Sequence, residues 1–128
     1  MSTVTVVIPK PLWLTSNRHA VNRGHRAAIV RGIKDEMFKA AYRARLSTYD
    51  GPVAAEWTIR YPKGVSWLHG DAANAQPTTK ACLDALVPQW LPGDGPLHVV
   101  AETFTRGPNL DRPGDHEIAL TLTPQERP

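Results

Sequence analysis

Apolar and polar side chains alternate along VAAEWTIRY, the stretch from Val53 to Tyr61, and this period restricts the backbone conformation. Successive side chains of a β-strand point to opposite faces, so the stretch predicts a strand with one buried face. The side chains predicted to be buried are Val53, Ala55, Trp57, Ile59 and Tyr61. A strand of this kind needs neighbouring strands and a second layer over its apolar face.

The second layer is predicted to be helical. From Arg26 to Leu46, apolar residues recur at steps of three and four, which predicts one long helix. The buried stripe of this helix is predicted to contain Val30, Ile33, Met37, Ala41 and Ala44. A shorter helix is predicted over Thr78–Val87, with Pro77 in its first turn and Pro88 ending it.

Three further stretches are rich in β-branched or apolar residues and predict strands: Thr3–Ile8, Leu97–Thr105 and Glu117–Thr123. The long segment from Pro62 to Gln76 is predicted to be a loop, and a loop of this length is usually functional or mobile. The order of elements predicts an α/β fold over residues 1–128. We expect a single domain, with a mixed sheet of about four strands and one long and one short helix.

Composition excludes several classes of protein. An apolar fraction of 41% and four tryptophans indicate a folded domain, and no apolar run approaches the roughly 20 residues that cross a bilayer. The N-terminus does not resemble a signal peptide. The single cysteine, Cys82, excludes an internal disulfide and a cysteine-built zinc site. We therefore expect a cytoplasmic protein without a membrane partner.

Basic residues are concentrated in the N-terminal third. The formal net charge is +3, and the segment 18–45 holds eight basic residues and two acidic ones. The rest of the chain is therefore mildly acidic. This asymmetry indicates a polyanionic partner, and the alternative is a solvated helix face with cationic side chains.

Several kinds of catalytic site are not indicated. The sequence has no G-x-S-x-G elbow, no P-loop and no dinucleotide-binding fingerprint. The five histidines are scattered without metal-ligand spacing, which argues against zinc. Cys82 falls inside the short predicted helix among apolar residues, so we expect it to pack in the core rather than act as a nucleophile.

Three aspartates are predicted near the ends of elements, where side chains can converge: Asp71, Asp84 and Asp94. Mg²⁺ prefers carboxylate oxygens, usually from one or two side chains together with phosphate oxygens and water. Lys80 could offset the charge of a phosphoryl group. The same residues also fit a structural role, because Asp71 could cap a turn and Lys80 with Asp84 has the i,i+4 spacing of a helical ion pair.

Three stretches resemble the RusA family of Holliday-junction resolvases, in the version carried by actinobacterial phages. They are WLTSNRHAVNRGHRAAIVRG, DAANAQPTTKACLDAL and LPGDGPLHVV. The family combines an Asn-Arg motif and a basic helix with an Asp-bearing loop, a helix that carries Lys and Leu-Asp-Ala/Gly-Leu, and a turn with paired acids. The resemblance extends from about Val7 to Arg106 and implies a RusA-like fold.

The resemblance also implies site residues. Asp71 matches the first aspartate of the loop, Lys80 the helix lysine and Asp94 the aspartate of the turn, and these three are the expected catalytic residues. Asp71 and Asp94 are expected to hold Mg²⁺ or Mn²⁺. Asn74 matches the loop asparagine and is expected to hold the loop or a phosphate.

Two positions differ from the better-known bacterial members. Ala73 stands in place of their second loop aspartate, and Gly93 in place of the first acid of the turn. Fewer carboxylates imply weaker metal binding or a different ligand. We expect Asp84 to complete the metal site, with His69 and Glu102 as alternatives.

The implied function is a Mg²⁺-dependent endonuclease that resolves Holliday junctions by paired nicks during DNA recombination and repair. A homodimer would match the two-fold symmetry of the junction. The residues expected to contact DNA are Asn17, Arg18, Arg23, Arg26, Arg31, Lys34 and Asn74. Two alternatives are a junction-binding module that has lost cleavage, and a phage structural or interaction protein whose acids are merely surface residues.

Overall fold

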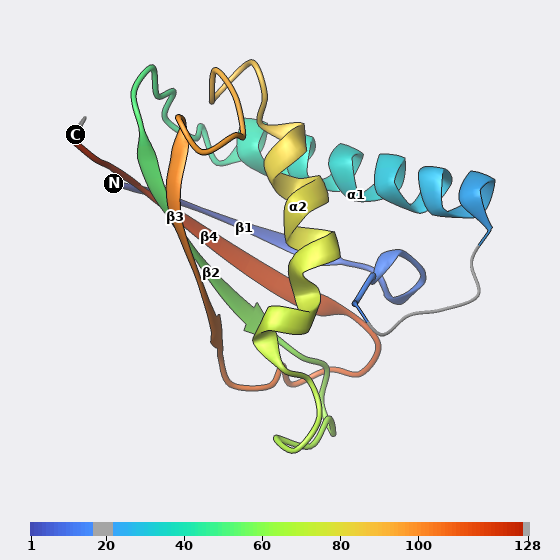
Figure 1. Ribbon diagram of the computed structural model, residues 1–128. Helices are drawn as coiled ribbons and strands as arrows, with labels where there is room; N and C mark the ends of the chain where they lie inside the picture. Colours follow the sequence, from blue (N-terminus) through green and yellow to red (C-terminus); the bar gives the residue numbers. More distant parts are fainter. Residues whose placement is uncertain (17–21, 127–128) are drawn as a thin grey trace.

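A computed structural model of the chain describes residues 1–16 and 22–126. Its framework is one four-stranded sheet with the strand order β1-β4-β2-β3 (Figure 1). The strands are β1 (Ser2–Ile8), β2 (Val53–Arg60), β3 (Val99–Arg106) and β4 (His116–Pro124). β4 pairs antiparallel with β1 and β2, whereas β2 and β3 are parallel. The sheet is therefore mixed, as the sequence predicts.

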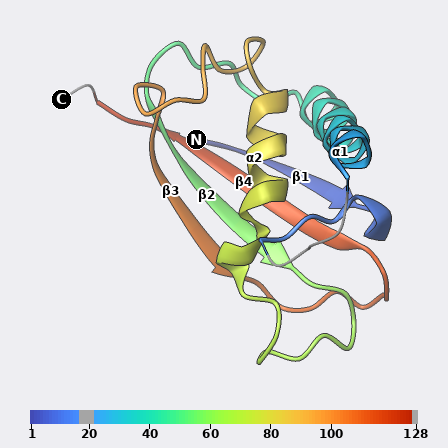
Figure 2. The same ribbon diagram turned by 45° about the vertical axis from the view of Figure 1, so that its right-hand side comes forward.

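Two helices, α1 (Arg23–Arg43) and α2 (Gln76–Ala85), cover one face of this sheet (Figure 2). Two short 3-10 helices, η1 (Lys10–Leu12) and η2 (Ala72–Ala75), precede α1 and α2. α2 lies in the connection between β2 and β3, because parallel neighbours need a crossover that returns the chain to the same end of the sheet. The predicted α/β fold with one long and one short helix is confirmed. No helix in the described part of the chain is long and apolar enough to span a membrane.

The alternation along β2 builds the core, as predicted. The side chains of Val53, Ala55, Trp57, Ile59 and Tyr61 are all buried. Trp57 lies opposite Leu120 of β4, and α1 adds Ile33 and Met37 to the same core. Burying a side chain of this size stabilises the fold by about 1.5–3 kcal/mol.

α1 begins one turn earlier than the sequence predicts, at Arg23 instead of Arg26. The reason is the N-cap. Asn22 Oδ1 accepts a hydrogen bond from the backbone N of His25 at 2.7 Å, which satisfies a donor of the first turn. The first turn of α1 is fully exposed, so the spacing of apolar residues does not reveal it.

The predicted stripe of α1 is correct in its centre, where Ile33, Met37 and Ala41 are buried. It is wrong at both ends, because Val30 is only half-buried and Ala44 is exposed. Ile29 takes the place in the core that the periodicity assigns to Val30. The helix ends at Arg43, and Arg45 has a positive φ of 53°, a conformation that cannot continue a right-handed helix.

α2 begins and ends two residues before the predicted Thr78–Val87, and Pro77 lies in its first turn as predicted. The prediction that Cys82 is a core residue is confirmed, because its side chain is fully buried. Burial raises the pKa of the Cys82 thiol to about 12, so the thiol is protonated at neutral pH. Cys82 packs α2 against the core.

Candidate functional site

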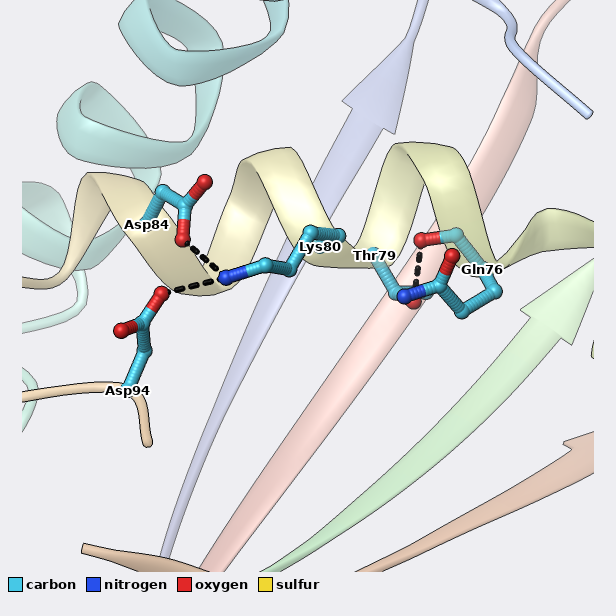
Figure 3. A network of polar contacts seen from close by, with 5 residues as sticks. All are labelled: Gln76, Thr79, Lys80, Asp84 and Asp94. Carbon is cyan, nitrogen blue, oxygen red and sulfur yellow. Dashed lines mark hydrogen bonds and ion pairs between the residues drawn. The ribbon is translucent and has the colours of Figure 1, made fainter. Parts of the chain in front are cut away.

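Lys80, Asp84 and Asp94 meet at the exposed side of α2 (Figure 3). Lys80 Nζ donates hydrogen bonds to Asp84 Oδ1 at 2.8 Å and to Asp94 Oδ2 at 2.5 Å. Two carboxylates therefore share one ammonium group. The side chains stay partly exposed, by 49% for Lys80 and 33% for each aspartate. We call these three residues the Lys80 cluster, and it is accessible to solutes.

The Lys80 cluster combines a local contact with a longer-range one. Asp84 follows Lys80 by one helical turn, so the two side chains leave the same side of α2. Asp94 comes from the turn that follows the helix. The start of that turn is fixed by Trp90, which is buried and whose backbone N donates to Leu86 O at 2.9 Å. Packing of this turn on the core brings Asp94 back alongside α2.

Gly93 occupies the place that the resemblance assigns to the first acid of the turn. A Cβ at this position would lie 2.6 Å from Cδ2 of His98, closer than real Cβ atoms approach. Any side chain at position 93 would therefore require the His98 ring to move. The acid that the turn places beside Lys80 is Asp94.

The three groups of the Lys80 cluster shift one another's pKa. Side-chain hydrogen bonding with Asp84, and then with Lys80, lowers the pKa of Asp94 to about 2. Burial, and then the neighbouring Asp94, raise the pKa of Asp84. The hydrogen bonds to Asp84 and Asp94 raise the pKa of Lys80. At neutral pH the cluster thus contains an ionised Asp94 beside a protonated Lys80.

Two shallow grooves between α1 and α2 border the Lys80 cluster. Arg26 lines the first, of about 200 Å³, together with Lys80 and Asp84. Lys34 lines the second, of about 260 Å³, and Asp84 belongs to its wall as well. Two of the predicted DNA contacts, Arg26 and Lys34, therefore each share a groove with Asp84, and Asp35 also lines the second groove.

The other basic residues predicted to contact DNA lie elsewhere. Arg23 is exposed at the start of α1, and Arg31 is exposed but lines neither groove. Asn17 and Arg18 lie outside the described residues.

Asp71 belongs to a different set of contacts. It is the N-cap of η2, where its Oδ1 accepts from the backbone N of Ala73 at 3.0 Å. Its backbone carbonyl accepts from the Tyr61 hydroxyl at 3.1 Å. Asn74 ties the same segment to the N-terminal part of the chain, because its carbonyl accepts from Ser16 N at 2.9 Å. Asp71 thus precedes α2, whereas Asp94 follows it.

The remaining candidate ligands do not join the pair of carboxylates either. His69 is exposed in the loop before η2, and Glu102 accepts a hydrogen bond from Trp57 Nε1 at 2.8 Å. In residues 1–16 and 22–126, no three Asp, Glu, His or Cys side chains gather where they could hold one metal ion. The structure therefore brings together Asp84, Asp94 and Lys80, and leaves Asp71 apart from them.

Sequence reasoning missed a second cluster, centred on Arg106. The guanidinium carbon of Arg106 lies 4.5 Å from the ring centre of Tyr61 and 4.3 Å from that of Trp67. Its Nη2 donates to Asn109 Oδ1 at 2.8 Å, and Asn109 Nδ2 donates to Val65 O at 2.7 Å. These residues come from β3, from the chain after β2 and β3, and from the loop that carries Asp71. The one indication of this cluster in the sequence is the length of that loop, because long loops are usually functional or mobile.

Neither the known protein-family models nor the curated proteins contain a match to this chain. The likeness to RusA resolvases therefore stays a prediction that rests on the three quoted stretches. What the geometry supplies is chemical: two adjacent carboxylates, one ammonium group and two flanking cations on one exposed face.

Proposed function

We propose that this protein is a metal-dependent endodeoxyribonuclease that cuts branched DNA, with the Holliday junction as its substrate. The proposal depends on one observation: Asp84 and Asp94 converge on Lys80 beside two cations of α1. Hydrolysis of a phosphodiester by a metal ion needs carboxylates for the metal and cations for the polyanion. This face of the protein offers both.

Asp84 and Asp94 suit Mg²⁺ or Mn²⁺ by their chemistry. Such a cation is commonly held by one or two carboxylates, while water and phosphate oxygens complete its shell. Both carboxylates already share a cation, the Lys80 ammonium, and both are partly exposed. The metal would supply Lewis acidity and a water molecule with a lowered pKa.

Side chains of the protein would bind the phosphates and stabilise the charge that develops during cleavage. Lys80 would exchange a carboxylate partner for a phosphate oxygen and stabilise the charge that develops there. Arg26 and Lys34 would hold backbone phosphates of a duplex arm, which gives binding without base reading. The resemblance also assigns Asp71 to the metal, although Asp71 lies outside the Lys80 cluster.

The proposal extends to assembly and location. A Holliday junction has two-fold symmetry and is resolved by two opposed nicks, so we propose a homodimer with one active site in each subunit. Recombination and repair in the cytoplasm of a bacterium, or of the bacterial host of a phage, is the proposed setting.

The test is cleavage of an end-labelled four-way junction with Mg²⁺, with Mn²⁺ and with a chelator. We expect symmetric nicks that require the metal. Asp94→Asn should abolish the nicks and leave junction binding intact or slightly tighter, because it removes both a ligand and a repulsive charge. Asp50→Asn is the matched control, because Asp50 is an exposed acid in the turn before β2. Absence of metal-dependent nicks by the wild type would sink the proposed function, and equal cleavage by the two variants would sink the role of Asp94.

A second candidate is a protein that binds junctions without cutting them. The observation that favours it is the number of carboxylates: the Lys80 cluster has two, and Ala73 and Gly93 supply none. Salt-sensitive junction binding with no metal-dependent nick would identify this function. Binding to neither junction nor duplex would reject both candidates.

A further inference from the structure

The loop between β2 and η2 presents two large apolar side chains to solvent. Trp67 is 65% exposed and Leu68 is 92% exposed. They are adjacent in sequence and lie four and three residues before Asp71. Single exposed apolar side chains are common on protein surfaces, but two large ones that are adjacent at a loop tip form a candidate contact surface for another molecule.

The tip of the loop rests on an ordered base. Arg106 Nη1 donates to Gly70 O and Arg106 Nη2 donates to Val65 O, both at 3.4 Å. Two local turns add further hydrogen bonds: His69 N donates to Ser66 O at 2.9 Å, and Leu68 N donates to Ser66 Oγ at 3.1 Å. The loop is therefore pre-organised, which lowers the entropy that its side chains lose when they bind a partner.

The environment of Trp67 favours an aromatic partner. Its ring lies on the Arg106 guanidinium at 4.3 Å, and Tyr61 supports that guanidinium from 4.5 Å. The indole is thus fixed at one side and largely exposed elsewhere. A rigid exposed indole is a stacking surface, and base–aromatic stacking contributes about 1–3 kcal/mol per base.

The size of the patch argues against a protein partner. A stable protein interface buries about 800 Å² on each side and needs some twenty residues. Trp67 and Leu68 are two side chains on one turn. Proteins that distort DNA commonly insert one or two apolar side chains of this kind between bases.

Charged residues lie at the base of the same loop. Lys63 N donates a hydrogen bond to Arg112 O at 2.8 Å, and Asp111 directly precedes Arg112.

We propose that Trp67 and Leu68 form an apolar wedge that stacks on unpaired bases of DNA. This inference rests on the proposed function, because it takes DNA as the partner, and it adds a binding site for bases that are unpaired or easily unstacked, as they are at a branch point. The wedge lies on the loop that carries Asp71.

The test is binding of fluorescent DNA by the full chain, measured by anisotropy with a four-way junction, a single strand and a blunt duplex. Trp67→Ala should weaken binding to the junction and the single strand by about tenfold, and should leave duplex binding within about twofold. Trp67→Phe should restore part of the loss, because phenylalanine still stacks. Leu68→Ala should also weaken binding to the junction. Val100→Ala is the control for an exposed apolar residue on β3.

The outcomes separate the wedge from the proposed function. If the wild type binds the junction and Trp67→Ala binds it equally well, the wedge is wrong and DNA binding stands. An equal loss on junction and duplex also overturns the wedge, because that loss indicates a damaged fold. If Trp67→Ala does not fold, Leu68→Ala decides, since its side chain is almost fully exposed. A wild type that binds no DNA overturns both proposals, and capture of a protein partner by the same patch overturns the wedge.

Discussion

At the residue scale, Gly70 controls how the loop that carries Asp71 meets the sheet. Its φ of +77° lies in the region that favours glycine, and a Cβ there would lie 2.9 Å from both Tyr61 and Arg106. Gly114 has a similar φ of +88°, but a Cβ would meet nothing within 4 Å. Substituting Gly114 therefore tests the backbone conformation alone, whereas substituting Gly70 tests the backbone conformation together with crowding against Tyr61 and Arg106.

We expect Gly114→Ala to lower the free energy of unfolding by roughly 1–2 kcal/mol, the cost of a left-handed conformation for alanine. Gly70→Ala should lower it further, by about 1–3 kcal/mol, because the methyl group also displaces Tyr61 or Arg106. Urea unfolding of the two variants and the wild type measures both effects. Equal destabilisation by the two variants would show that Tyr61 and Arg106 can move aside with no loss of stability.

His116 is a second residue whose environment has a measurable consequence. Its ring stacks on Trp13 at 3.8 Å, and Tyr61 lies edge-on at 5.2 Å. Burial lowers the pKa of His116 to about 4, against a smaller opposing effect of Asp115. The unfolded chain therefore takes up a proton near pH 6.5, which the folded chain accepts only near pH 4.

Because the unfolded state binds more protons in that window, this residue makes the protein less stable as the pH falls from about 6.5 to about 4, and it has no such effect above the window. His116→Gln cannot take up the proton. The stability advantage of the wild type over His116→Gln should thus shrink as the pH falls through the window. Urea unfolding at several pH values measures it, and a constant difference would contradict the predicted shift.

At the element scale, α1 presents its cations in two directions. Arg26 and Lys34 border the grooves next to the Lys80 cluster, whereas Arg31 lines neither groove. Lys39 is exposed on the same helix and pairs with Glu36 at 3.2 Å. Arg26 and Lys34 are therefore the cations of α1 that would face DNA beside the Lys80 cluster, and Lys39 is the matched control.

Replacing Arg26 and Lys34 with Ala should weaken junction binding. It should also reduce the slope of log K against log salt by roughly 0.9 for each DNA phosphate that the variant no longer neutralises. Lys39→Ala should leave the slope unchanged, and Arg31→Ala tests whether the other side of α1 also binds DNA. Binding at several salt concentrations measures the slopes. An unchanged slope in the double variant would identify the basic residues as a solvated helix face.

At the scale of the whole molecule, α2 separates the two acids that the resemblance assigns to one metal site. Asp71 caps η2 before the helix, and Asp94 follows it. Asp94 pairs with Lys80 in the middle of α2, whereas the Asp71 carboxylate accepts from Ala73 N. The function of Asp71 is thus the part of the proposed site that most needs a direct test.

Asp71→Asn is a suitable variant, because the Asn side-chain oxygen can still accept from Ala73 N and keep the cap. We expect stability within about 0.5 kcal/mol of the wild type, unchanged junction binding and loss of cleavage, as for Asp94→Asn. Thermal unfolding and the junction assay check these outcomes. Full cleavage by Asp71→Asn would show that Asp71 only caps η2.

Features that repeat along the backbone could be predicted from the order of residues alone. The alternation of β2 identified its buried face, and the spacing of Ile33, Met37 and Ala41 identified the buried face of α1. The pairing of Lys80 with Asp84 also followed from i,i+4 spacing. These features are predictable because strand and helix geometry fixes the direction of each side chain from its position alone.

Contacts between segments that are distant along the chain became apparent only in the folded protein. Asp94 reaches Lys80 because the turn after α2 packs on the core, and Arg106 lies against Tyr61 and Trp67 because β2 and β3 run in parallel to the same end of the sheet. The spacing of residues along the chain does not encode these contacts. They depend on strand order and on the path of each loop, which the free energy of the whole core selects.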